Sequence, residues 1–544
     1  MSLQRPLCRT VAPEIASVCQ PILSLDSPFR LIGDGYAEFV PFEDEFAVMY
    51  EDTGRGAVSP VLLSLVTVLQ MLEKVPDRTA AQFVIFRLDW KYALHLPLDY
   101  AGFDFSVLSD FRQRLLAHGK ERFVFDHLVQ QFLKLGFIKR RSKVRTDSTH
   151  IVGVVERLQQ VDLVTESLRV ALEAAHKEAP SWVERTLPVV FCEQYQRPLN
   201  TYGMGDDETH QQLVQAGRDS FWFLGQVEQS APQGVRELAA VATLRTVLSQ
   251  QFPGGPDAPP ARRRPTGSEV IESPHEPDAR FATKRGQSHI GYKMQVTETY
   301  DEGLPHLIAD MEATNALAND SPELQNIQDR LQERGIEPCE QQVDQAYMSG
   351  ENLARSAEQG IELLGMPLED TQGPQGFRQA DFVIDEAAKK VQCPAGQTSV
   401  VWTERAAGEG APPQILVRFS AQACQACPHF GVCTKSSQGR SLTLHPHRHL
   451  LAERRAQAKT EAFKKRLHPR AGSEGTISEL VRAHGMRRAR YRGVSKQRLQ
   501  GYFTAAAVNL KRLARFLARQ AGVNGAAGTG ESRRRPLVAA VGTA

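Results

Sequence analysis

Apolar residues recur at helical spacing in the first part of the chain. Ser59 and Pro60 have the character of a cap and a first helical residue, and the apolar positions that follow repeat every three or four residues. These positions are Val61, Leu62, Leu65, Val66, Leu69 and Leu72. A second helix is predicted to begin near Ser106 and to stop before Gly119. Residues 1–140 are therefore expected to form a helical domain.

The pattern changes to that of a buried strand at residues 141–155. The segment KVRTDSTHIVGVV is rich in β-branched residues, which favour the pleated and buried environment of a strand. Residues 156–250 return to helical periodicity and are expected to be a helical insertion. Residues 251–279 are rich in proline, glycine and charge, which predicts a flexible linker.

Residues 280–372 combine strands with helices. The segment HIGYKMQVTETYD alternates between apolar and polar positions, and HLIADMEAT follows a short turn, so the two are expected to form an antiparallel hairpin. A helix is predicted near residues 321–334, then a strand, a turn and a helix in EQQVDQAYMSGENL, and a last strand in GIELLGMP. The fold class is therefore a mixed α/β sheet.

The remaining chain divides into three parts. Residues 373–445 are loop-rich and hold clustered cysteines, residues 446–521 return to helical patterns, and residues 522–544 have the composition of a disordered tail. At 544 residues the chain is expected to have several domains. The start of the chain has no basic segment followed by an apolar run, and no apolar stretch is long enough for a membrane span. We therefore expect a cytoplasmic protein without membrane contact.

Positive charge is concentrated near the end of the chain. The whole chain has a formal net charge of only +2, but residues 440–520 hold 20 Lys and Arg against four Glu, a surplus of 16 positive charges. A polyanion is the usual partner of such a surplus. The alternative is a set of solvated helix faces.

Four cysteines gather in one segment. Cys424, Cys427 and Cys433 have the spacing C-x2-C-x5-C, and Cys393 lies upstream. A close pair with two outlying thiols can bind one tetrahedral Zn²⁺, which would be structural in a segment with so few apolar residues. His429 could replace one thiol, and four thiols without a metal are the alternative.

Three acids stand where a metal site for phosphodiester chemistry needs them. Two Mg²⁺ ions about 4 Å apart can activate the attacking oxygen and neutralise the leaving one, and such hard ions prefer carboxylates. Asp147 lies in the first strand, Asp344 ends a short strand, and Glu474 opens a helix in basic surroundings. Each acid alone could instead be a turn former or a helix cap.

Three separated segments carry a resemblance to a known family. They are VRTDSTHI around Asp147, VDQAYMSGENL around Asp344, and RAGSEGTISELVRAHGMRRARYRG around Glu474. Together with further stretches from about residue 30 to 520, they resemble the DDE transposases of bacterial insertion sequences. The likeness is to the insertion-sequence family numbered eleven eighty-two, which is related to the groups numbered four and five.

The resemblance implies both a fold and a reaction. The fold is a ribonuclease-H-like catalytic core, with Asp147 on its first strand, Asp344 on its fourth and Glu474 on the helix after its fifth. The reaction is cleavage at the element ends followed by strand transfer into target DNA, with Mg²⁺ as cofactor. Residues 1–140 are then expected to serve DNA binding or assembly. The protein is expected to act as a homo-oligomer on DNA, in association with the nucleoid.

Several basic residues near the third acid are candidates for DNA contacts. Arg470 stands four residues before Glu474, where the related transposases have an arginine. Their usual tyrosine is Leu467 here, and their usual basic residue seven positions after the acid is Val481, with Arg482 next to it. The run after Met486 combines cations with a ring, which suits phosphate contacts supported by stacking. The expected DNA-binding residues are Arg470, Arg482, Arg487, Arg488, Arg490, Tyr491, Arg492 and Lys496.

Two other acids compete for roles in the site. Glu479 lies five residues after Glu474, so on one helix the two point in different directions, and the motif favours Glu474. Asp310 is a candidate extra ligand, although an ordinary strand residue is the simpler interpretation. A decayed transposase that only binds DNA, and a metal nuclease without strand transfer, are the alternative functions.

Overall fold

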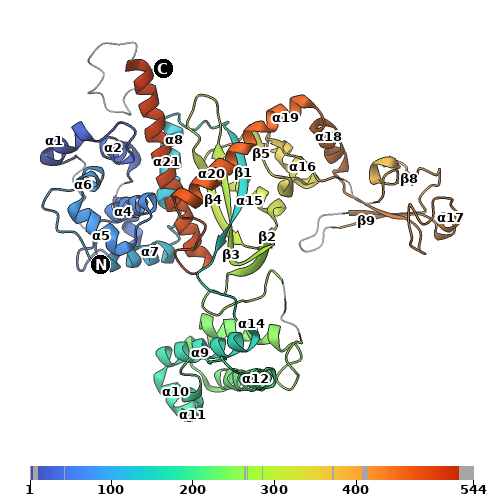
Figure 1. Ribbon diagram of the computed structural model, residues 1–544, viewed down its shortest axis with the longest axis horizontal. Helices are drawn as coiled ribbons and strands as arrows, with labels where there is room; N and C mark the ends of the chain where they lie inside the picture. Colours follow the sequence, from blue (N-terminus) through green and yellow to red (C-terminus); the bar gives the residue numbers. More distant parts are fainter. Residues whose placement is uncertain are drawn as a thin grey trace.

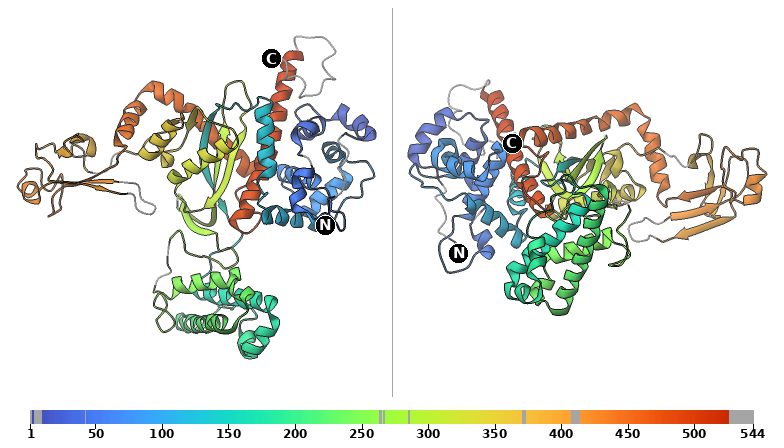
Figure 2. Two further views of the ribbon diagram at one scale, coloured as in Figure 1. Left: turned by 180° about the vertical axis from the view of Figure 1, so that it is seen from behind. Right: turned by 60° about the horizontal axis from the view of Figure 1, so that its bottom comes forward.

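The computed structural model describes residues 2–3, 10–41, 43–262, 265, 267–284, 286–369, 373–406 and 414–525. A mixed sheet lies at the centre of the molecule, with the N-terminal helices on one side of it (Figure 1). Two smaller units project from this centre in different directions, one helical and one made of short strands (Figures 1 and 2). The fold is therefore of the mixed α/β class, as predicted from the sequence.

The N-terminal region is helical, which confirms that expectation. Ser59 caps α4 by accepting a hydrogen bond from the Leu62 N–H at 3.2 Å, and α7 begins at Ser106 as predicted. The elements are α1 (Pro13–Ile22), α2 (Pro28–Asp34), α3 (Tyr36–Phe39), the 3-10 helix η1 (Glu43–Met49), α4 (Pro60–Glu73), α5 (Asp77–Phe86), α6 (Leu88–Leu94), α7 (Ser106–Ala117) and α8 (Phe123–Lys134).

The central sheet has six strands. They are β1 (Lys143–Val152), β2 (Arg280–Lys284), β3 (Gln287–Thr299), β4 (Ile308–Asn315), β5 (Glu340–Gln342) and β6 (Glu362–Leu364). β3 pairs antiparallel with β1, β2 and β4, so the predicted β3–β4 hairpin is confirmed. β5 lies between β1 and β6 and is parallel to both. Residues that follow β5 therefore continue beside the middle of β1, because Gln342 pairs with Arg145 and β1 runs on to Val152.

Helices cover the sheet and join it to the N-terminal region. They are α15 (Asp320–Glu333), η2 (Gln345–Tyr347), α16 (Gly350–Glu358), α18 (Arg448–Ala458), α19 (Glu461–Leu467), η4 (His468–Ala471), α20 (Gly472–Ser478), the π-helical turn η5 (Glu479–Ala483) and α21 (Val494–Gly525). α21 packs against β4 on one side and against α4 and α8 on the other. One continuous hydrophobic core consequently includes the N-terminal helices, the sheet and α21.

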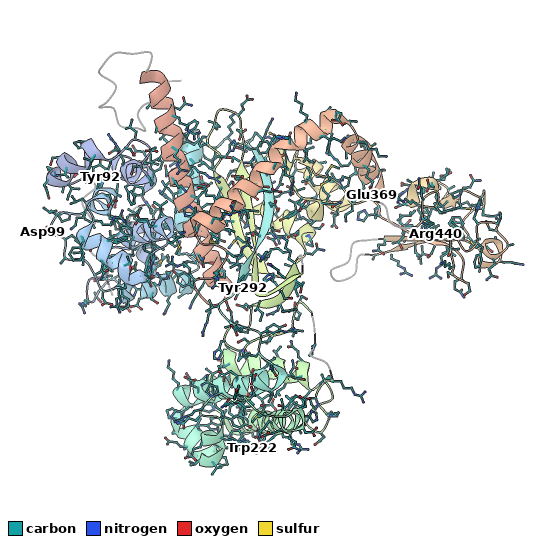
Figure 3. All side chains as sticks on the ribbon, viewed as in Figure 1. Tyr92, Asp99, Trp222, Tyr292, Glu369 and Arg440 are labelled. Carbon is teal, nitrogen blue, oxygen red and sulfur yellow. The ribbon has the colours of Figure 1, made fainter. Side chains whose placement is uncertain are left out.

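The helical insertion has a core of its own. It consists of α9 (Gln160–Glu178), α10 (Pro180–Thr186), α11 (Val189–Gln194), α12 (Asp206–Ser230), α13 (Gln233–Arg236) and α14 (Ala239–Gln251). Apolar residues of α9, α12 and α14 form its buried cluster, and Trp222 of α12 marks this unit in Figure 3. The unit lies between β1 and β2 in the sequence, so it leaves the sheet intact.

The last residues of the linker that follows the helical insertion pack against the sheet. Composition predicted a flexible segment over residues 251–279, and its described residues after Gln251 contain no helix or strand. Glu276 is nevertheless buried, and it accepts a 2.8 Å hydrogen bond from the Tyr292 hydroxyl of β3. This long-range contact has no local signal in the sequence.

The cysteine-rich region is a small β unit. It contains η3 (Gln379–Asp381), β7 (Val383–Asp385), β8 (Lys390–Gln392), β9 (Val401–Arg405), β10 (Gln414–Arg418), α17 (Ala421–Gln425) and β11 (Ser441–Leu444). Strands this short show little alternation, so the sequence indicated only loops. Six buried residues form its core: Phe382, Val391, Val417, Phe419, Leu442 and Leu444. Arg440 marks this unit in Figure 3.

The predicted disordered tail, residues 522–544, begins inside α21, so the prediction is wrong for residues 522–525, which are helical. Residues 526–544 of that tail lie outside the described part of the chain. No helix among the described residues has both the length and the apolar character needed to cross a membrane.

Two glycines of α12 should respond oppositely to alanine. A Cβ at Gly217 would overlap the buried Phe252 ring, whereas no described atom lies within 4 Å of a Cβ at Gly225. We expect Gly217→Ala to destabilise the helical insertion by about 1–3 kcal/mol and Gly225→Ala to stabilise it by up to about 1 kcal/mol. Thermal unfolding of the full chain measures both. Equal melting temperatures for the two variants would contradict this packing.

Candidate active site

Asp147 lies in the middle of β1, on the sheet face that is covered by η4 and α20. Its side chain is 16% exposed, and its Oδ2 accepts a 3.1 Å hydrogen bond from the Ser473 hydroxyl. Burial raises the pKa of Asp147 above its usual range, and the charge of Asp344 adds to this. The Ser148 N–H, Arg470 and Ser473 oppose it. The carboxylate is thus partly desolvated and close to a second acid.

Asp344 follows β5 and caps the short helix η2. Its Oδ1 accepts a 2.7 Å hydrogen bond from the Gln345 N–H, and its side chain is 52% exposed. Since Arg145 of β1 pairs with Gln342 of the parallel strand β5, the residues after β5 bring Asp344 beside Asp147. Asp344 thus lies two residues beyond the last residue of β5, and it also has the helix-capping role that the sequence left open as an alternative.

One arginine bridges the two aspartates. The Arg470 Nη2 lies 3.4 Å from Asp147 Oδ2 and 3.2 Å from Asp344 Oδ1. The two carboxylates are therefore close enough to share a single cation. Sequence reasoning assigned Arg470 to DNA and did not foresee this contact, because the three residues are far apart along the chain.

Glu474 lies on α20, one residue after Ser473, and its side chain is exposed. Among the described residues, no group of three or more His, Cys, Asp or Glu side chains is placed so that it could hold a metal ion. The structure thus brings Asp147 and Asp344 together around Arg470, with the backbone of Glu474 beside them on the adjoining helix.

A buried carboxylate fixes α20 against the sheet. Glu298 of β3 is 1% exposed, and its Oε1 accepts a 2.8 Å hydrogen bond from Arg145 Nε. Its Oε2 accepts hydrogen bonds from Thr476 of α20 at 2.6 Å and from Arg512 of α21 at 2.7 Å. A buried charge is tolerated only with such partners, and removing one of them is strongly destabilising. Glu298 therefore connects β3 to β1, α20 and α21 around the site.

Arg145 extends this network to the segment that carries Arg470. It lies two residues before Asp147 on the same face of β1, and its Nη1 donates a 2.6 Å hydrogen bond to the Pro469 carbonyl in η4. Sequence analysis missed Arg145, Glu298, Ser473 and Thr476. The only available signal was that three of the four lie within the resembling segments around Asp147 and Glu474.

The two competing acids are held in ion pairs. Glu479 pairs with Lys511 at 2.8 Å and with Arg512 at 2.9 Å, and these cations outweigh burial and lower its pKa. Asp310 is buried between Arg330 and Arg334 at 2.8 and 2.6 Å, and here too the two cations outweigh burial and lower the pKa. Both acids have structural partners outside the Arg470 site.

The predicted DNA-binding residues divide into two groups. Arg487 donates to the His150 carbonyl at 2.6 Å, Arg490 donates to the Val75 carbonyl at 2.7 Å, and the Tyr491 ring packs under the Arg112 guanidinium at 4.8 Å. These three side chains are engaged within the protein. The exposed members of the set are Arg482, Arg488, Arg492 and Lys496.

The four clustered cysteines face one cavity of the β unit. Cys393 follows β8, Cys424 belongs to α17, and Cys427 and Cys433 follow it. All four line this cavity, and all are free thiols. The Arg440 N–H donates to Cys424 Sγ at 3.4 Å. Burial raises the pKa of Cys433, and the other three cysteines add to this while Arg440 opposes it.

Two family models match the chain. A model described as "Transposase DDE domain" matches residues 392–514, and a model described as "Transposase domain (DUF772)" matches residues 18–114. The first range includes Glu474 and the cysteines, and the second covers most of the N-terminal helices. No curated protein and no solved structure matches the chain.

These matches support an insertion-sequence transposase of the DDE type. A DDE transposase domain implies nuclease or transposase activity, with DNA as partner, and this family generally uses Mg²⁺. The matches therefore support transposition and recombination as the process.

Two glycines of α20 provide a test of the site geometry. A Cβ at Gly472 would overlap the Arg145 guanidinium, whereas a Cβ at Gly475 would meet no described atom within 4 Å apart from its chain neighbours and the backbone of its own helix. We expect Gly472→Ala to displace Arg145 from Glu298 and to lower unfolding stability by about 1–3 kcal/mol. Gly475→Ala should leave stability equal or slightly higher. Chemical denaturation of both variants checks this, and a Gly472→Ala protein as stable as the parent would contradict the described network.

Proposed function

We propose that this chain cleaves DNA at the ends of an insertion sequence and joins those ends to target DNA, with Asp147, Asp344 and Glu474 as its metal-binding acids. The observation that carries the proposal is the single guanidinium shared by Asp147 of β1 and Asp344, which follows the parallel strand β5. Two carboxylates that share one cation are a suitable donor pair for another, and hard oxygen donors of this kind suit Mg²⁺.

The sheet supports a ribonuclease-H-like core. Without β2, the strand order is β4-β3-β1-β5-β6, with antiparallel pairing on one side of β1 and parallel pairing on the other. In this numbering Asp147 lies on the first core strand and Asp344 follows the fourth. Glu474 lies on α20, which packs against β1. This order of elements supports the placement that the resemblance implies.

Each residue of the site has a proposed task. Bound Mg²⁺ would supply activation of the attacking oxygen and neutralisation of the leaving oxygen. Asp147 and Asp344 would hold it, and Glu474 would complete the site by turning inward from its exposed position on α20. The exposed cations Arg482, Arg488, Arg492 and Lys496 would bind the DNA backbone close to the acids.

We expect the three acids to be required for chemistry but not for the fold. Asp147→Asn, Asp344→Asn and Glu474→Gln each keep the size of the side chain and remove its charge. Since a metal contributes several kcal/mol to the transition state, each should lower cleavage and strand joining by a factor on the order of 100 or more. The assay uses duplexes that carry the element ends, with Mg²⁺.

The exposed Glu461 on α19 provides the control. Glu461→Gln should keep the parental rate. Normal strand joining by Asp344→Asn would refute the triad. Binding of end DNA without cleavage by the parent would instead indicate a decayed transposase, and cleavage without joining would indicate a simple nuclease.

We also propose a structural zinc site in the β unit, for which the four thiols must draw together, because their described positions do not form a metal-binding group. Its support is the placement of four free thiols around one cavity, in a unit whose described residues include a core of six buried apolar side chains. Four thiolates are a common tetrahedral ligand set for structural Zn²⁺, and a metal can replace the stability that so small a core lacks.

Zinc content and stability should change together. We expect the purified chain to release one equivalent of Zn²⁺ on thiol modification, measured with a chromogenic chelator. Cys427→Ser should lose that zinc and make the β unit sensitive to proteolysis. Cys192→Ser, a half-buried cysteine of the helical insertion, is the matched control and should change neither. The proposal would be contradicted if the parent protein contains no zinc and its β unit still resists the protease.

A further inference from the structure

Arg470 occupies the position between the two aspartates that a metal ion would need. Its Nη2 contacts one oxygen of each carboxylate, at 3.4 and 3.2 Å. A guanidinium and a divalent cation repel each other, and they would compete for the same oxygens. A metal can bind both carboxylates only after Arg470 has moved away.

Arg470 is held mainly by these two contacts. Its Nε is buried and has no hydrogen-bond partner among the described residues, and its side chain is 21% exposed. Only part of the guanidinium is therefore used in contacts within the protein. The described fork of Arg145, in contrast, is occupied by Glu298, Pro469 and His306. Arg470 is thus the arginine of this cluster that can exchange its partners at a small cost.

A phosphate would be a suitable new partner for Arg470. The guanidinium binds phosphate oxygens in the same forked geometry as carboxylate oxygens. The exposed Lys465, in the last turn of α19 just before η4, attracts a DNA backbone to this side of the site. Its neighbours are already paired, Lys464 with Glu461 and Arg466 with Glu362, each at 2.7 Å. Asp344 is half-exposed, which leaves an approach from solvent to the aspartates.

We infer that Arg470 couples DNA binding to metal binding. In the free protein its guanidinium occupies the oxygens of Asp147 and Asp344 and so blocks the metal. When DNA binds, Arg470 moves to a DNA phosphate and leaves both carboxylates available to the metal. This inference rests on the proposed function, because it assumes that Asp147 and Asp344 are the metal ligands. Linkage requires that DNA and metal then strengthen each other's binding. The device would prevent metal-dependent chemistry until DNA is in place.

Mn²⁺ binding to the full-length chain tests the closed state, with free Mn²⁺ measured by its electron paramagnetic resonance signal. Arg470→Gln should bind Mn²⁺ about tenfold or more tighter than the parent in the absence of DNA, within the usual range of coupling between sites. Arg470→Lys keeps one charge but loses the fork, and should lie between the two. Arg515→Gln removes an exposed cation of α21 and should match the parent. Melting curves establish that each variant is folded.

A DNA duplex of arbitrary sequence tests whether DNA draws Arg470 away from the two aspartates. Its sequence can be arbitrary because contacts to phosphates do not depend on sequence. The Asp147→Asn, Asp344→Asn double variant with the same duplex serves as the blank for Mn²⁺ bound by DNA itself. DNA should tighten Mn²⁺ binding about tenfold in the parent and leave Arg470→Gln nearly unchanged.

Two outcomes separate this inference from the proposed function. Equal Mn²⁺ affinity in the parent and Arg470→Gln, with or without DNA, would overturn the role of Arg470 and leave the metal site intact. If neither protein binds more Mn²⁺ than the double variant under any condition, the aspartates are not metal ligands, and both proposals fail.

Discussion

The candidate site depends on one buried carboxylate, Glu298. It is almost fully excluded from solvent, yet it accepts hydrogen bonds from Arg145 on β1, Thr476 on α20 and Arg512 on α21. Because a buried charge without partners is very unfavourable, these donors cannot leave one at a time at low cost. The sheet and the helices that carry the functional residues are consequently fixed to one another.

This constraint reaches the two aspartates through Arg145. Its guanidinium also binds the Pro469 carbonyl, next to Arg470, so the position of Arg470 follows from that of β1. Ser473 on the next helix then donates to Asp147. The fixed part of the site thus consists of Asp147, Ser473 and the backbone of Arg470. The Arg470 side chain can exchange its partners, and Asp344 and Glu474 lie nearer to solvent.

Much of the fold could be predicted from local pattern. Helical spacing with a capping serine gave α4, and strict alternation followed by a short turn gave the hairpin of β3 and β4. The strands of the β unit have only three to five residues, too few for alternation to show, so they were missed. The end of the linker was expected to be flexible, because the contact between Glu276 and Tyr292 has no local signal.

The site was predictable only in part, for a similar reason. Asp147 and Asp344 could be placed at strand positions from their sequence context, and Glu474 from its motif. The bridge of Arg470 to both aspartates joins residues that are more than 100 positions apart, and the Glu298 network joins four separate elements. Polar contacts of this kind follow no periodicity, so only a three-dimensional structure reveals them.

The proposed role of Asp147, Asp344 and Glu474 is to bind the metal that acts on DNA. A crystal structure of the chain with Mn²⁺ and element-end DNA, in which anomalous scattering locates the metal, would show this role. We expect Mn²⁺ to be coordinated by Asp147 and Asp344, with Glu474 turned toward it and Arg470 on a phosphate. Mn²⁺ bound to other acids, with Arg470 still between the two aspartates, would contradict it.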